Sequence, residues 1–137
     1  TIHYEIEEFE RVLRFLLLEK NKRMHEGRNL EIGVAINPKT SIDVLTRFYK
    51  LIDKVLVMSV EPGYGGQKYI ESTDMKIDKI KKQFGIKVEV DGGINKEIIK
   101  KDVMKYVDDF VIGSYITGSD NMKERINLIK EEIKWKK

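Results

Sequence analysis

Two glycine-bearing segments, each following an apolar run directly, hold the residue types best suited to chemistry in this 137-residue sequence. The first spans residues 55–67, in which three glycines, Gly63, Gly65 and Gly66, fall within four positions and flank Tyr64. Glycine is required where a phosphate oxygen approaches main-chain N–H groups or where φ is positive, because a Cβ would obstruct both. The loop therefore indicates an anion site, with an ordinary tight turn as the alternative.

The second segment, residues 88–94, places a single carboxylate after an apolar run. Asp91 ends the run and is followed by Gly92 and Gly93. An Asp-Gly pair can also form a hairpin turn or a helix N-cap, but a helix rather than an antiparallel strand is predicted next, so a hairpin fits poorly. In barrel enzymes the carboxyl end of a strand is the catalytic position. We therefore expect Asp91 to point into a site.

The elements that must position these residues alternate between two kinds. Short β-branched runs are each followed by a longer stretch of helical periodicity, which predicts parallel strands joined by helices. The predicted strands are residues 1–5, 31–36, 55–60, 87–91 and 109–113, and the predicted helices are residues 7–25, 41–52, 72–83, 96–106 and 121–135. Predicted helix caps are Ser41, Asn95 and Asn121, with left-handed glycines at Gly27 and Gly85.

The number and size of these units indicate the architecture. Five βα units in 137 residues average about 27 residues each, and eight such units would give about 220, a size typical of a closed (β/α)8 barrel. The fold class is therefore predicted to be α/β, a partial TIM barrel of about five units, with an open doubly wound sheet as the alternative. No linker or sequence repeat divides the chain, so residues 1–137 are predicted to form a single domain.

The glycine loop resembles the "Pro-Gly-aromatic-Gly-Gly-Gln" signature of ribulose-phosphate 3-epimerases, where the loop after barrel strand six closes over the sugar phosphate. Four other strand ends are similar to the same family in the same order: residues 3–5 to strand four, 35–40 to strand five, 90–93 to strand seven and 110–114 to strand eight. The chain thus resembles the C-terminal portion, strands four to eight, of a ribulose-phosphate-binding TIM barrel.

This resemblance implies an isomerase that interconverts D-ribulose 5-phosphate and D-xylulose 5-phosphate in the pentose phosphate pathway. It implies that Asp91 is one of two acid/base carboxylates and also a ligand of one divalent metal ion, zinc, iron, manganese or cobalt. The substrate is a small phosphorylated ketose. The residues implied to bind it and its phosphate are Gly63, Tyr64, Gly65, Gly66, Gly92, Gly93, Gly113 and Ser114.

The sequence also departs from the family pattern. A Ser on strand one, a His and an Asp with a nearby Met on strand two, and a His on strand three have no counterpart here, so the other metal ligands and the second carboxylate are expected to be absent from this chain. We expect the isolated chain to be inactive and to form a homo-oligomer or to pair with a complementary N-terminal segment. The absence of Met at position 1 favours a fragment. An allulose-6-phosphate-type epimerase and a truncated, non-catalytic phosphate-binding domain remain as alternatives.

Composition narrows the function classes further. Lys and Arg number 26 against 23 Asp and Glu, a net charge of +3, so no strong field for nucleic acid is predicted. Cysteine is absent, which removes disulfides and thiolate chemistry and fits a cytoplasmic protein. The longest apolar stretch is interrupted by Arg14 and Glu19, far short of the roughly 20 residues of a membrane span. His3 has no second His at ligand spacing and is not predicted to bind metal.

Overall fold

The computed structural model describes residues 1–134 and shows one sheet of five parallel strands. In order across the sheet they are β1 (Ile2–His3), β2 (Gly33–Ile36), β3 (Lys54–Met58), β4 (Lys87–Asp91) and β5 (Asp109–Val111). Every neighbouring pair is parallel. The predicted sequential sheet is confirmed. The doubly wound alternative is wrong because that fold reverses its strand order at a switch point.

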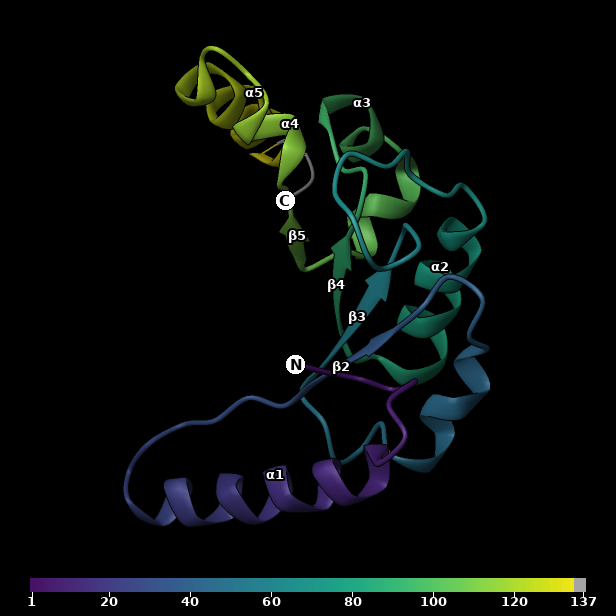
Figure 1. The fold of residues 1–137 in the computed structure, drawn as a ribbon, viewed down its shortest axis with the longest axis vertical. Coiled ribbons are helices and arrows are strands. Elements are labelled where there is room, and N and C mark those ends of the chain that lie inside the picture. Colours follow the sequence, from purple (N-terminus) through teal and green to yellow (C-terminus); the bar gives the residue numbers. More distant parts are fainter. Residues whose placement is uncertain (135–137) are drawn as a thin grey trace.

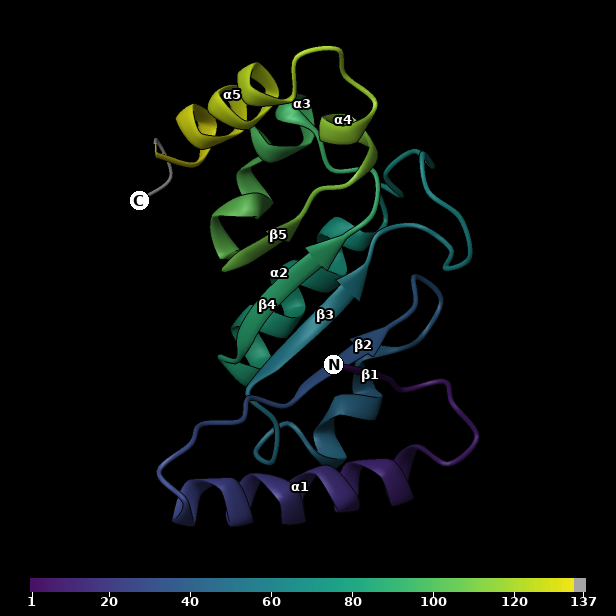
Figure 2. The same cartoon turned by 60° about the vertical axis from the view of Figure 1, so that its left-hand side comes forward.

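Helical segments follow each strand. They are α1 (Phe9–His25), the 3-10 helix η1 (Ile42–Arg47), α2 (Thr73–Phe84), α3 (Lys96–Ile99), the 3-10 helix η2 (Asp102–Tyr106), α4 (Ser114–Thr117) and α5 (Met122–Lys134). Figure 1 views the sheet nearly edge-on, with α2 along one side of β3 and β4, and Figure 2 shows α2 behind these two strands. Across residues 1–134, none of the helices combines the length and the apolar character that a membrane span requires.

The core lies between the sheet and its helices, because alternate strand residues point to opposite faces. The helix-facing residues of the three central strands are fully buried, namely Val34, Ile36, Val55, Val57, Val88 and Val90. Ile77 and Ile80 of α2 belong to the same cluster. On the other face, Lys54 of β3 pairs with Glu89 of β4 at 2.7 Å between Nζ and Oε2.

Predicted helix ends are confirmed where side chains cap them. The Asn95 side chain accepts hydrogen bonds from the amides of Glu97 (2.9 Å) and Ile98 (3.0 Å). Asn121 accepts one from the amide of Glu124 at 3.1 Å. Gly85 ends α2 in the left-handed conformation, with φ of 61°. These caps and the left-handed glycine follow directly from local residue type.

Three helix predictions need correction. Residues 41–52 form only the 3-10 segment η1, where the Thr46 hydroxyl bonds the Asp43 carbonyl (2.7 Å) and competes with regular helix pairing. The predicted helix 96–106 divides into α3 and η2 because Lys101, between them, has a non-helical ψ of 141°. The short helix α4 was not predicted. Trp135, placed in the last predicted helix, lies outside the described residues.

Candidate functional site

The carboxyl ends of β3, β4 and β5 meet at one edge of the sheet. In the strand register Met58 lies opposite Asp91, and Asp91 lies opposite Val111. Because the strands are parallel, the loops that leave these three residues start side by side. The glycine loop, the Asp-Gly-Gly turn and the Gly-Ser segment are therefore neighbours in space although they lie far apart in sequence.

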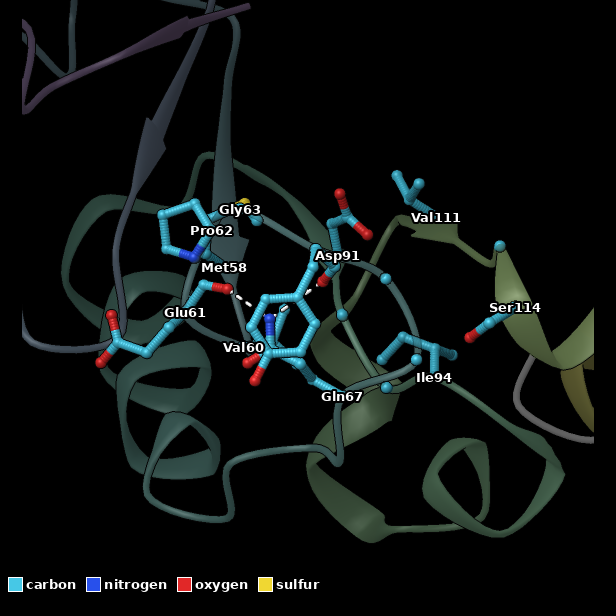
Figure 3. A pocket seen from close by; sticks show the side chains of 16 residues that line it. Met58, Val60, Glu61, Pro62, Gly63, Gln67, Asp91, Ile94, Val111 and Ser114 are labelled. Carbon is cyan, nitrogen blue, oxygen red and sulfur yellow. Dashed lines mark hydrogen bonds between the residues drawn. The ribbon is translucent and has the colours of Figure 1, made fainter.

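These loops enclose a cavity of about 360 Å³. All nine residues singled out in the sequence line it: Asp91, Gly63, Tyr64, Gly65, Gly66, Gly92, Gly93, Gly113 and Ser114. Figure 3 shows the Asp91 carboxylate between the glycine loop on one side and Val111 and Ser114 on the other. The structure thus gathers the predicted residues around one pocket, while their individual roles stay predictions.

Two of the strand ends that resemble the epimerase family do not reach this pocket. Neither residues 3–5 nor residues 35–40 contribute to its lining. They instead bind each other, since the Glu5 carboxylate accepts hydrogen bonds from the Asn37 amide (2.8 Å) and the Thr40 hydroxyl. Lys76 of α2 donates to the carbonyls of Asn37 and Pro38, both at 2.8 Å, and fixes this turn from the other side.

The side chain of Gln67 forms hydrogen bonds within the glycine loop. Gln67 Nε2 donates to the carbonyl oxygens of Glu61 (2.6 Å) and Tyr64 (2.9 Å), as the dashed lines in Figure 3 indicate. Gly63 and Gly66 have φ of 140° and 78°, values that L side chains rarely adopt. The Tyr64 residue is 74% exposed, so this aromatic ring stands at the mouth of the pocket.

The turn after Asp91 is packed too tightly for any side chain. A Cβ on Gly92 would lie 2.4 Å from Cγ2 of Val60, and a Cβ on Gly93 would lie 2.3 Å from the backbone nitrogen of Tyr69. Both glycines also have positive φ, 121° and 64°. Glycine is therefore required here by close approach as well as by backbone conformation.

The Asp91 carboxyl group is partly desolvated and lies near one like charge, that of Glu89. Burial raises its pKa above the ordinary value, the negative charge of Glu89 raises it further, and His3 partly offsets both. Glu89 exerts this effect from the same face of β4, two residues earlier. A carboxyl group whose pKa is raised holds a proton more readily, which suits a residue that must both accept and return one.

Other lining residues were not singled out from the sequence. They are Met58, Val60, Glu61, Pro62, Gln67, Ile94 and Val111. Met58 and Val111 share the face of Asp91, so the period of two along each strand was a usable signal for them. For Gln67 the signal was its place in the resembling signature, while its bonds to two carbonyls needed the folded loop.

The divalent metal implied by the resemblance can be tested against the donor set. Within residues 1–134, no three His, Cys, Asp or Glu side chains lie close enough together to hold a metal ion. Asp91 and Glu61 are the acidic residues that line the pocket. Glu61 is paired with Lys39, at 3.0 Å between Oε1 and Nζ. The residues present do not fit a metal site by themselves.

Comparison with known proteins gives the same family as the strand-end motifs. The model of the ribulose-phosphate 3 epimerase family matches residues 1–117. The chain is 33% identical over 119 residues to a ribulose-phosphate 3-epimerase of Bacillus subtilis, covering 82% of this chain and 55% of that protein. It is 40% identical over 124 residues to one of Buchnera aphidicola, covering 85% and 54%. A Candida glabrata relative of the same name is 31% identical over 135 residues, covering 98% of this chain and 52% of that protein.

The chain spans about half the length of the curated relatives it matches. Its five-stranded sheet, its helical crossovers and the order of its strand-end motifs agree with the part of the barrel that the match covers. This chain belongs to the ribulose-phosphate 3-epimerase family.

Proposed function

We propose that this chain supplies half of the active site of an epimerase that inverts C3 of D-ribulose 5-phosphate to give D-xylulose 5-phosphate. The observation that carries this proposal is that Asp91, whose pKa is raised, shares one pocket with three glycine-bearing segments. The names of the relatives support the reaction, and the pocket supports the part of it that this chain performs.

The reaction needs a proton to leave the carbon next to a ketone and another to return on the opposite face. Two carboxylates on opposite sides of that carbon can do this, each acting in turn as base and acid. Asp91 is proposed as one of them. The second carboxylate is expected from the part of the relatives' length that this chain does not span. Any further ligands of a divalent ion are expected from the same part.

The phosphate is proposed to lie against main-chain amides rather than against a cationic side chain. The pocket is lined by the glycines of all three segments and by one serine, namely Gly63, Gly65, Gly66, Gly92, Gly93, Gly113 and Ser114. A phosphate held there would fix the sugar at a distance from the reacting carbon, so that binding energy orients C3 against Asp91. Tyr64 is proposed to cover the bound sugar.

The test is to complete the barrel and then to remove one carboxylate. The N-terminal half of the Bacillus subtilis relative, joined to or expressed with this chain, should give ribulose 5-phosphate epimerase activity. Asp91→Asn should lower turnover by about 10³-fold while leaving the affinity for inorganic phosphate within about twofold. Asp78→Asn is the matched control, since Asp78 pairs with Lys82 on α2, away from the pocket.

Three outcomes separate the candidate functions. Activity lost with Asp91→Asn but not with Asp78→Asn supports the epimerase. Activity on allulose 6-phosphate in preference to ribulose 5-phosphate would change the sugar and keep the mechanism. Phosphate binding with no turnover in the completed barrel would leave a non-catalytic phosphate-binding domain and contradict the proposal.

A further inference from the structure

A single buried hydroxyl connects the end of β3 to the turn that follows Asp91. Ser59 comes directly after β3 and is 0% exposed. Its Oγ lies 2.7 Å from the carbonyl oxygen of Gly92 and 2.9 Å from that of Asp91. Buried hydroxyls are normally hydrogen-bonded, and this one has two acceptors but only one proton to give.

The competition between these acceptors decides where the proton goes. The Asp91 carbonyl already accepts the Ser59 amide at 2.7 Å. Among residues 1–134, no backbone amide donates to the carbonyl of Gly92 outside the regular elements. The hydroxyl is also closer to Gly92, so within the described residues its proton satisfies a carbonyl that receives no backbone amide.

Fixing that carbonyl also fixes the next amide. The peptide group between Gly92 and Gly93 is planar and trans, so the N–H of Gly93 points away from the carbonyl of Gly92 and therefore away from Ser59. Within the described residues, no backbone carbonyl accepts a hydrogen bond from the Gly93 amide. Gly93 lines the pocket, whereas the buried Ser59 does not.

The backbone around Ser59 makes this arrangement rigid. The Ser59 carbonyl accepts the amide of Ile70 at 2.8 Å, so the segment that follows the glycine loop is tied to the same residue. That segment includes Tyr69, whose backbone nitrogen leaves no room for a Cβ on Gly93. Ser59 therefore bonds to the turn after Asp91 through its side-chain hydroxyl, and to the segment that precedes α2 through its main-chain carbonyl.

We propose that Ser59 is a positioning residue, whose hydroxyl holds the Gly92 carbonyl so that the Gly93 amide faces the pocket as a preset donor to an anionic ligand. The proposal rests on the proposed function for the nature of that ligand, a phosphate ester. Preset amides cost no reorganisation when the anion binds, which is why their orientation controls affinity.

The experiment uses the purified 137-residue chain, inorganic phosphate as the probe, and two readouts. The first is the ¹H–¹⁵N amide spectrum without phosphate, and the second is the phosphate dissociation constant from titration of the same spectrum. Ser59→Ala should shift and broaden the amide signals of Gly92 and Gly93 and weaken phosphate binding about tenfold, the equivalent of about 1.4 kcal/mol. Ser59→Cys keeps a weak donor and should give a smaller loss, which serves if the alanine variant does not fold.

The matched control is Thr73→Val. Thr73 is the other buried polar residue in the described part of the chain, and its hydroxyl donates to the Ile70 carbonyl at 2.6 Å. This variant loses one buried hydrogen bond at a comparable cost in stability. It should leave the signals of Gly92 and Gly93 and the phosphate affinity unchanged, so a loss confined to the Ser59 variants cannot come from lowered stability alone.

The two readouts separate the failure of this inference from that of the proposed function. Unchanged Gly92 and Gly93 signals in a folded Ser59→Ala variant would overturn the positioning role, whatever the phosphate affinity. A wild-type chain that binds no phosphate, with the Gly93 signal still dependent on Ser59, would overturn the phosphate site and keep the positioning of the amide. Equal phosphate affinity in wild type and both Ser59 variants would show that the amide orientation has no effect on binding.

Discussion

The backbone nitrogen of Tyr69 lies where a side chain on Gly93 would have to begin, 2.3 Å from an ideal Cβ at that position. The contact joins the turn after β4 to the segment that leads into α2, so it fixes one wall of the pocket relative to another. Because the obstructing atom belongs to the main chain, no side-chain rotation can relieve it.

Gly93→Ala is therefore expected to lower the free energy of unfolding by roughly 3 kcal/mol, from positive φ and backbone overlap together. Urea denaturation monitored by circular dichroism measures this. Gly65→Ala is the control, since Gly65 lacks positive φ and a Cβ there meets nothing within 4 Å. It should change the free energy of unfolding by less than about 0.5 kcal/mol. Equal stability of the two variants would refute the close approach.

The stability of the sheet should depend on pH through two aspartates at the amino ends of its strands. Asp53 accepts the amide of Ile32 and an ion pair from Lys20, both at 2.6 Å. Asp108 accepts the amide of Val88 and an ion pair from Lys81, both at 2.8 Å. Burial alone would raise each pKa, but the lysine and amide hydrogen bonds outweigh it and hold the pKa of both carboxyls below the ordinary value.

A carboxyl group whose pKa is lower in the folded state stabilises the fold at pH values above its unfolded-state pKa, which is near 4. This stabilisation is lost as the pH falls through the folded-state pKa. Asp108→Asn should lower the free energy of unfolding at pH 7 by about 1 kcal/mol, since the carboxylate is partly exposed. The loss should vanish toward pH 2. Asp120→Asn, at an exposed position, is the control. An Asp108→Asn effect that persists undiminished in acid would contradict the ionic origin.

Strand order, strand-end motifs and pocket residues could be predicted because each depends on local residue type. Apolar runs that end in Gly-rich segments mark the carboxyl ends of β3 and β4, and parallel pairing then brings them together. Helix continuity was harder to predict. Lys101 lies within a stretch of helical periodicity, yet its side chain pairs with Asp74 at 2.6 Å and its backbone has a non-helical ψ of 141°. Tertiary contacts of this kind override the periodicity.

Ser59 shows why part of the site could not be predicted. In the sequence it is a small polar residue after an apolar run and has no charge or spacing to mark it. Its importance depends on a carbonyl 33 residues away that receives no backbone amide from residues 1–134. Such a relationship exists only after β3 and β4 have paired in register and the turn between Asp91 and Ile94 has formed.

The glycine loop is expected to be mobile in the ligand-free protein, because a loop that admits and covers a phosphate sugar must open. Amide hydrogen exchange at Gly63–Gln67 should be faster than at β3. Gln67→Ala should accelerate it further, since that side chain bonds two carbonyls of the loop. Exchange in the loop as slow as in β3 would argue against a lid.

The last prediction concerns the two open edges of the sheet. Within residues 1–134, β1 pairs only with β2 and β5 only with β4, so each presents unpaired main-chain groups on its outer side. Val111 of β5 is 37% exposed beside that edge. Open edges with apolar neighbours recruit other strands. We expect the purified chain to self-associate, and to give a single 1:1 species when the N-terminal half of the Bacillus subtilis relative is added.

Size-exclusion chromatography with light scattering measures both states. Val111→Lys should reduce self-association of the chain alone, because a lysine on an edge strand opposes pairing with a second edge. Met75→Lys is the matched control: Met75 is 66% exposed but lies on α2, away from both edges, so the same charge there should leave the distribution of species unchanged. A wild-type chain that is monomeric at all concentrations, and that converts ribulose 5-phosphate without the added half, would show that the five-stranded sheet is complete as it stands.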